Sequence, residues 1–317
     1  MNDQRMLVTG ATGFVGLRVC SLLESLGAVV VKASRSPSRE PNTFQVSALG
    51  SNTDWRKALQ GCTAVVHLAA RVHVMNDQVV NPLLEFRQAN TEGTLQLARQ
   101  AVQAGVKRMV FVSSIKVNGE AGHFTAGSKP NPIDPYGISK FEAEEQLLEF
   151  GRQSGLEVVV LRPPLVYGPG VKANFLKLLS AVARGIPLPL GAVNNKRSLV
   201  FVGNLANAIA TCLVHPKAKG RVYLVSDNSD VSTAQLVREM AQAFGRKANL
   251  ISISPRLMES LAAILGKRAA AQRLLGDLTV SPQALCEELD WKPPFNMQAG
   301  MKETADWYMH QGQLKLR

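Results

Sequence analysis

The chain has 317 residues, of which 46% are hydrophobic, a share that is ordinary for a soluble globular protein and sufficient for a large core. Its 36 Lys and Arg against 24 Asp and Glu give a formal net charge of +12, which attracts anions, including small molecules that carry phosphate. The basic residues form no dense run and no stripe interleaved with aromatic residues, so we do not expect a nucleic acid partner.

The four cysteines lie far apart without a CxxC pair, which predicts buried thiols in a reducing cytoplasm, with neither disulfides nor a metal site. No secretory leader precedes the first apolar run, and no apolar stretch reaches the roughly 18 residues of a membrane span. Residues 255–275 alternate apolar and charged side chains at helical spacing, which favours a packed amphipathic helix over a membrane anchor. We therefore expect a soluble, cytoplasmic protein with no membrane span.

Short apolar runs alternate with longer helical patterns through the first half of the chain. The runs are continuous in Val, Ile and Leu, as in strands that are buried on both faces of a parallel sheet. Repeated strand–helix alternation predicts a doubly wound α/β domain. The apolar runs occupy residues 6–8, 29–32, 64–69, 108–112 and 157–161, and the helical patterns occupy residues 14–26, 83–104 and 136–154.

A glycine-rich turn, TGATGFVG at residues 9–16, follows the first predicted strand and precedes a helix. Glycine lets the chain turn tightly and approach a pyrophosphate closely, and the helix offers its free N–H groups to the anion. The strand before the turn and the helix after it make a dinucleotide site a much stronger prediction than three glycines alone. The residues expected to contact the cofactor here are Gly10, Thr12, Gly13, Phe14, Val15 and Gly16.

The end of the second predicted strand bears on the choice between NAD(H) and NADP(H). Sites that select NAD place an acid about 20 residues beyond the glycines, where it binds the ribose 2′-hydroxyl. Here the chain offers Ser34 and Arg35 instead of an acid. A hydroxyl and a guanidinium suit a 2′-phosphate, so NADP(H) is favoured, while NAD(H) stays open.

Tyr136 and Lys140 lie four residues apart at the start of a predicted helix, which places them on one face. A free tyrosine has a pKa near 10, and a neighbouring ammonium is expected to lower that pKa and make the phenol useful as an acid and base. Ser113 and Ser114 end the strand predicted at residues 108–112, where a hydroxyl could orient a substrate oxygen.

Beyond residue 168 the alternation loosens. A Pro/Gly-rich segment at residues 163–170 predicts a shaped loop, and short strands are expected around residues 199–202 and 222–225. We expect a Rossmann-type NAD(P)-binding domain over residues 1–167, and over residues 168–317 a smaller, mainly substrate-binding region that could add strands to the main sheet.

With these motifs in place, the chain resembles the extended branch of the short-chain dehydrogenase/reductase family, which contains nucleotide-sugar epimerases, dehydratases and reductases. The resemblance implies that Ser114 is the catalytic hydroxyl, that Tyr136 is the acid/base, and that Lys140 holds the ribose and tunes Tyr136. It covers nearly the whole chain and rests on the glycine turn, HLAA at residues 67–70, NTEGT at 90–94, the serines before Gly119, the Tyr/Lys pair and RPPLVYG at 162–168. The further cofactor contacts that it implies are Leu68, Ala69, Ala70, Asn90, Ser113, Tyr136, Lys140, Pro163 and Leu165.

The same resemblance implies that the C-terminal region binds the nucleotide diphosphate of the substrate, UDP in particular. Asn174 and Arg197 match positions that grip it, and Arg273 is a further candidate. Arginine suits this role because its planar fork makes two bonds to phosphate oxygens. The alternatives without a ligand are that Asn174 caps a turn and that Arg197 and Arg273 face solvent.

Three departures from the family pattern narrow the reaction. Dehydratases carry an Asp-Glu pair after the catalytic hydroxyl, whereas this chain has Ile115 and Lys116, which argues against 4,6-dehydration. Lys116 could instead contact the substrate or face solvent. Ala48 replaces an acid that binds the adenine amine in many relatives, and the Ser34–Arg35 pair replaces the acidic NAD selector.

These features favour a reductase that delivers hydride from NADPH to C4 of a UDP-4-keto-6-deoxy-hexosamine in surface-polysaccharide (O-antigen) synthesis. The main alternative is a UDP-sugar 4-epimerase with bound NAD; a reductase of a non-sugar ketone and a non-catalytic NADP sensor are weaker ones. The family resemblance also suggests a homodimer formed through helices 83–104 and 136–154.

Overall fold

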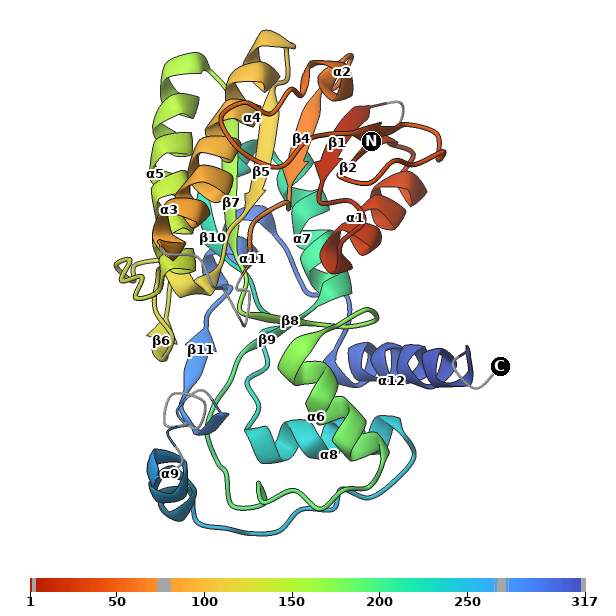
Figure 1. The fold of residues 1–317 in the computed structure, drawn as a ribbon, viewed down its shortest axis with the longest axis vertical. Helices are drawn as coiled ribbons and strands as arrows, with labels where there is room; N and C mark the ends of the chain where they lie inside the picture. The colour runs from red at the N-terminus through yellow and green to blue at the C-terminus, as the bar shows by residue number, and fades with distance from the viewer. Residues whose placement is uncertain (2–3, 73–80, 265, 267–271, 273, 315–317) are drawn as a thin grey trace.

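The computed structural model describes residues 1, 4–72, 81–264, 266, 272 and 274–314. Its centre is a parallel sheet of seven strands in the order β10-β7-β5-β4-β1-β2-β3, which confirms the expected α/β fold (Figure 1). The strand order reverses between β1 and β4, and ligands of such sheets bind outside the carboxyl ends of the strands at this point. The strands are β1 (Arg5–Thr9), β2 (Val29–Ser34), β3 (Thr43–Gln45), β4 (Ala64–His67), β5 (Arg108–Val112), β7 (Glu157–Arg162) and β10 (Val222–Leu224).

Helices cover both faces of the sheet, because its strands are apolar on both sides. One face packs against α1 (Phe14–Ser25), α7 (Val202–Val214) and α11 (Gln283–Leu289). The opposite face packs against α2 (Arg56–Leu59), α4 (Gly93–Gln103) and α5 (Pro135–Ser154).

The helix expected over residues 83–104 is interrupted. It consists of α3 (Pro82–Phe86), a π-helical segment η1 (Arg87–Glu92) and α4. The segment buries Asn90 and Thr91 against α5, where the Asn90 amide donates to Ser139 Oγ at 3.0 Å and the Thr91 hydroxyl donates to Ser139 O at 3.0 Å. Such bulges are frequent at functional sites, and periodicity alone does not reveal them.

Much of the C-terminal region forms a second lobe below the carboxyl edge of the sheet (Figure 1). In its core the aromatic rings of Tyr167, Phe175, Phe201 and Phe295 contact one another, with Tyr167 and Phe175 stacked. The strand expected around residues 199–202 lies in this lobe, whereas the one expected around residues 222–225 is β10 of the main sheet. Two small parallel sheets pair β8 (Leu165–Tyr167) with β9 (Leu199–Phe201) and β6 (Gly122–Phe124) with β11 (Leu278–Val280). The helices of this lobe are α6 (Ala173–Ala183), α8 (Thr233–Ala243), α9 (Pro255–Ile264) and α12 (Met297–Leu314). Short 3-10 turns lie elsewhere in the chain, at η2 (Ile115–Val117) and η3 (Pro216–Ala218).

The helix expected over residues 255–275 is represented by α9, and most of its remainder, including Arg273, lies outside the described residues. Within the described ranges, no helix is long and apolar enough to cross a membrane.

Candidate active site

The glycine turn joins β1 to α1 in a conformation that requires its glycines. Gly10 has φ +67°, in the left-handed region, and its carbonyl accepts a hydrogen bond from Gly13 N at 2.9 Å. A Cβ on Gly16 would lie 2.1 Å from Gly10 O, so any side chain there would push the helix off the turn. No side chain caps the start of α1, which leaves its first N–H groups available to an anion.

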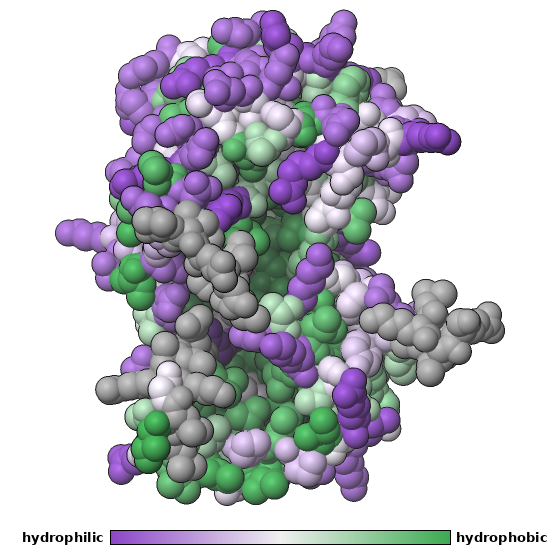
Figure 2. Space-filling model, in the orientation of Figure 1, coloured by the Kyte–Doolittle hydropathy of each residue, from purple (hydrophilic) through white to green (hydrophobic). Residues whose placement is uncertain are grey.

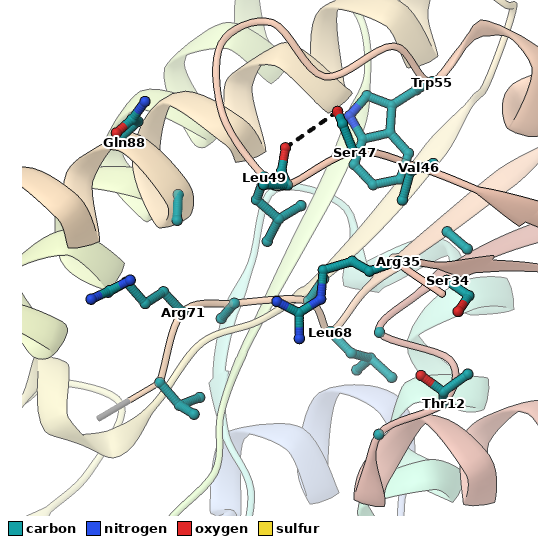
Figure 3. Close-up of a pocket in the computed structure, with 18 of the residues that line it drawn as sticks. Thr12, Ser34, Arg35, Val46, Ser47, Leu49, Trp55, Leu68, Arg71 and Gln88 are labelled. Atoms are coloured by element: carbon teal, nitrogen blue, oxygen red, sulfur yellow. Dashed lines mark hydrogen bonds between the residues drawn. The ribbon is translucent and has the colours of Figure 1, made fainter. Parts of the chain in front are cut away.

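A cavity of about 600 Å³ opens beside this turn, at the carboxyl ends of β1, β2 and β4 (Figure 3). Eight of the expected cofactor residues line it: Gly10, Thr12, Gly13, Ser34, Arg35, Leu68, Ala69 and Ala70. Among the other expected cofactor residues, Phe14 and Val15 are half-buried, and Gly16, Asn90, Ser113, Lys140 and Pro163 are buried outside its lining. The glycine cradle and the cavity next to it fit a dinucleotide.

The wall at the end of β2 carries the residues expected to select the cofactor. Ser34 is buried, and its hydroxyl accepts from Ser36 N at 3.2 Å. Arg35 is exposed, and Figure 3 shows its guanidinium reaching into the cavity, with Arg71 on the opposite wall. Ala48 also lines the cavity, so an apolar methyl group stands where many relatives carry an acid.

A buried hydrogen-bond chain holds the HLAA segment in place. The Thr9 hydroxyl accepts from Leu68 N at 3.2 Å and from Ala69 N at 3.1 Å. His67 links this hydroxyl, 2.6 Å from its Nδ1, to the Thr94 hydroxyl, 3.0 Å from its Nε2. Burial lowers the pKa of His67 to about 3, so the ring is neutral at physiological pH and shapes the cavity wall without carrying charge.

Asn90 acts on the backbone at the far end of the same segment. Its Oδ1 accepts from Arg71 N at 2.8 Å, and its Nδ2 donates to Arg71 O at 3.0 Å. With its bond to Ser139, this amide ties the loop after β4 to the helix that carries Tyr136 and Lys140. Its position as a cofactor ligand stays a prediction.

Tyr136 lies in the first turn of α5, and Asp134 and Pro135 fix the point at which this helix begins. Asp134 caps the helix by accepting from Gly137 N at 2.6 Å, and Pro135 occupies the first helical position. Burial raises the pKa of Tyr136 to about 12, the Asp134 carboxylate acts in the same direction, and a hydrogen bond with the Ser114 hydroxyl opposes them. Tyr136 and Ser114 are therefore brought together as expected.

Lys140 is buried below Tyr136. Its Nζ donates to Val112 O at 2.8 Å and lies 3.8 Å from the centre of the Phe111 ring. Burial lowers its pKa to about 7, although Glu144 opposes this effect. Burial is the largest influence on the pKa of both side chains, and for Tyr136 it acts against the lowering that Lys140 is expected to cause.

Ser113 supplies a further sign that a ligand completes this site. Its hydroxyl oxygen is buried and has no hydrogen-bond partner in the described part of the chain. Buried hydroxyls are nearly always paired, so an unpaired one at the end of β5 indicates a polar group that binds from outside the protein. A nicotinamide nucleotide fits this requirement.

Lys116 lies next to Ser114, the expected catalytic hydroxyl, and its ammonium contacts protein carboxylates. Its N–H donates to Ser114 Oγ at 3.2 Å, and its Nζ contacts the carboxylates of Asp134 and of Glu120, the latter at 2.9 Å. A Cβ on Gly137 would lie 2.8 Å from Lys116 O, so this backbone also touches the start of α5. The sequence analysis missed Asp134, although an Asp-Pro pair before a helix is a capping signal.

The expected substrate residues lie in the second lobe or at its border. Asn174 is exposed in the first turn of α6. Arg197 is half-buried, its Nη1 donates to Gly276 O at 3.0 Å, and burial lowers its pKa. Two of the expected cofactor contacts lie at the same border: Leu165 is 50% exposed at the start of β8, and Pro163 O accepts from Ile115 N at 2.9 Å. Arg273 lies outside the described residues.

Comparisons with known proteins agree on one family. The model of the NAD dependent epimerase/dehydratase family matches residues 6–226. A UDP-glucose 4-epimerase of Vibrio cholerae is 43% identical over 312 residues, which cover 96% of this chain and 95% of the relative. The N-acetyl-alpha-D-glucosaminyl-diphospho-ditrans,octacis-undecaprenol 4-epimerase of Escherichia coli O157:H7 is 31% identical over 255 residues, 78% of this chain and 74% of the relative. The structure of MoeE5 in complex with UDP-glucuronic acid and NAD has a TM-score of 0.76 and 25% identity, and the match covers 97% of this chain and 99% of MoeE5.

Proposed function

Because the chain belongs to the NAD dependent epimerase/dehydratase family, we propose that it moves a hydride at C4 of a UDP-linked sugar and that its net reaction is 4-epimerisation. Two relatives that are 43% and 31% identical are named as 4-epimerases, which supports this reaction over the reductase that the sequence favoured. The observation that carries the proposal is the Ser114–Tyr136 hydroxyl pair near buried Lys140, together with the cavity beside the glycine turn.

In the proposed mechanism, the Tyr136 phenolate takes the proton from the C4 hydroxyl as hydride leaves C4, and the resulting phenol returns that proton to the C4 oxygen when hydride comes back to the other face of the sugar. Ser114 orients the C4 oxygen and donates to it while it carries negative charge. Bound NAD supplies the hydride acceptor and donor. Lys140, once it carries a proton, stabilises the tyrosinate and binds the ribose.

A second candidate function is the reduction of a UDP-4-keto-6-deoxy-hexosamine by NADPH. Arg35 favours it, because a guanidinium at the ribose end of the cavity suits a 2′-phosphate and an exchangeable NADPH would suit a net reduction. Tyr136 would then only donate its proton, and Ile115 and Lys116 would still argue against dehydration.

Two assays on the purified protein separate these functions. For the epimerase we expect C4 interconversion of UDP-glucose or UDP-N-acetylglucosamine, followed by NMR without added cofactor. For the reductase we expect loss of NADPH absorbance at 340 nm with the UDP-4-keto sugar. Tyr136→Phe is expected to abolish either turnover and to retain nucleotide binding, whereas Tyr308→Phe, which alters a tyrosine bonded to Ser180 in the second lobe, serves as the control. Normal turnover by Tyr136→Phe would refute the mechanism.

The cofactor preference has its own test. We propose that Arg35 favours NADP(H), and expect Arg35→Ala to weaken NADPH binding about tenfold or more while leaving NADH binding nearly unchanged. Fluorescence titration of both nucleotides measures this ratio. Equal losses for the two nucleotides would assign Arg35 to the pyrophosphate or adenine instead of the 2′-phosphate.

We further propose a homodimer through the α3–α4 and α5 helices, a cytoplasmic location and a role in surface-polysaccharide synthesis. Asn174 and Arg197 are the proposed diphosphate ligands. Light scattering of the purified protein tests the dimer, and Arg197→Lys, which keeps the charge but loses the planar fork, tests the diphosphate contact through the KM for the UDP-sugar.

A further inference from the structure

The second lobe has one edge that faces away from the sheet and from the cofactor cavity (Figure 1). We define this distal edge as residues 184–186 together with residues 246–264. The two segments lie together, because the side-chain amide of Asn249 donates to Gly185 O at 3.1 Å. Just beyond the first segment, Leu188 N donates to Asn249 O at 2.9 Å and Ile251 N donates to Leu188 O at 2.8 Å. Helix α9 follows directly and lies at the same end of the molecule.

Large aliphatic side chains of the distal edge are exposed to solvent. Ile186 is 44% exposed, Ile251 is 49%, Leu257 is 54%, and Ile264 is 81% exposed. Figure 2 shows the hydrophobic colour spread over the lower end of the molecule, where this edge lies. Apolar side chains gathered in this way mark an interaction surface, whereas single ones scattered over a protein do not.

Helix α9 packs against the second lobe through one face and leaves another apolar face exposed to solvent. Met258 and Ala262, one turn apart, pack against the core of the second lobe. Leu257 and Ile264, two turns apart, lie on a different face of the helix and are the exposed ones. Because the inner positions are already filled by packed side chains, the outer ones cannot be buried by a rotation of the helix.

Basic side chains accompany these aliphatic ones. Arg184, Arg246, Lys247 and Arg256 are exposed along the distal edge, and the only acid in its two segments is Glu259. The imbalance extends through this half of the chain, since residues 168–317 contain 19 of the 36 Lys and Arg but only 10 of the 24 Asp and Glu. The edge is therefore both apolar and positively charged.

We propose that the distal edge docks on an anionic lipid surface, with Leu257 and Ile264 inserted at the headgroup boundary and the neighbouring basic residues paired with lipid phosphates. Helices with apolar and basic faces bind membrane interfaces in this way, and anionic lipids attract each added Lys or Arg. A second copy of the chain fits less well, because it would place the same positive charges opposite one another. Docking here leaves the cofactor cavity open to the solvent.

The test uses the full-length protein and sedimentation with vesicles of phosphatidylcholine alone or with about one third phosphatidylglycerol. We expect binding to the anionic vesicles that weakens as salt rises. The double variant Leu257→Asp/Ile264→Asp is expected to bind at least tenfold more weakly and to keep full soluble activity. The control is Val214→Asp, at an aliphatic residue that is 52% exposed at the end of α7, outside the distal edge.

Three outcomes would overturn the proposal. One is wild-type protein that stays in the supernatant with anionic vesicles. Another is equal binding by the double variant and the control, which would place any attraction in the net charge of the whole chain. The last is a change of oligomeric state in the double variant on light scattering, which would make a second copy the occupant of the edge. None of these outcomes depends on which sugar the enzyme converts.

Discussion

The buried ion pair between Arg162 and Glu144 yields the sharpest stability prediction, because it joins β7 to α5, the helix that carries Tyr136 and Lys140. Arg162 Nε lies 3.1 and 3.0 Å from the two carboxylate oxygens of Glu144, and its Nη1 donates to Asn118 Oδ1 at 3.0 Å. The two side chains are only 9% and 2% exposed. Glu144→Gln keeps the shape but leaves the guanidinium buried without a countercharge.

Breaking a buried pair on one side costs about 3–5 kcal/mol. For a chain of this size, 1 kcal/mol corresponds to roughly 2 °C of melting temperature, so Glu144→Gln is expected to lower the Tm by roughly 6–10 °C. Thermal unfolding followed by circular dichroism at pH 7 measures the shift. The matched control is Glu145→Gln, the exposed neighbour on the same helix, which should change the Tm by about 1 °C or less.

A double variant separates the loss of charge pairing from a loss of packing. Glu144→Leu/Arg162→Met removes both charges and fills their space with apolar atoms, and such exchanges are often neutral or stabilising. We therefore expect it to recover most of the Tm lost in Glu144→Gln. A Tm of Glu144→Gln equal to that of the control, or a double variant less stable than the single one, would refute the reasoning.

The remaining predictions concern the catalytic helix. Lys116→Met should raise the pKa of Tyr136, because the Asp134 carboxylate loses its ammonium partner, and the kcat/KM profile should move to higher pH, while Lys116→Arg should not move it. Gly137→Ala should lower kcat at least tenfold, since its Cβ would lie 2.8 Å from Lys116 O; wild-type kcat would contradict this. The cofactor-free protein should become more stable as the pH rises from about 7 towards 10.5, because unfolded Lys140 binds a proton that the folded form has released; urea midpoints of Lys140→Met should lack this rise.

The sequence predicts the parts of the site that are contiguous in the chain. The glycine turn needs only a strand, a turn and a helix in succession, and the Tyr136–Lys140 pair needs only helical spacing. Their electrostatics do not follow from spacing, because the pKa of Lys140 depends on Phe111 and Val112 of β5, which close around its ammonium only in the folded protein.

The contacts of Lys116 likewise depend on the folded chain and not on the local sequence. From the sequence, Lys116 could contact the substrate or face solvent. Its ammonium lies between Glu120 and Asp134, the latter 18 residues further along the chain, and sequence spacing does not reveal this arrangement. The π-helical segment was missed for a related reason, since its extra residue is stabilised by the contacts of Asn90 and Thr91 with Ser139 and not by any helical pattern.

The expected division of the chain near residue 168 does not separate two folding units, because segments beyond it belong to the main sheet and its core. Strand β10 pairs with β7 inside the main sheet, and α7 and α11 fill the core on one face of that sheet. Arg108 of β5 fixes this arrangement by donating to the carbonyls of Cys212 and Leu213, both at 3.2 Å, and of His215 at 2.9 Å, where α7 ends. Segments on both sides of residue 168 thus share the hydrophobic core on one face of the main sheet. Because the core on this face of the sheet combines side chains from both halves, a variant in the core face of α7 should disturb cofactor binding as well as stability.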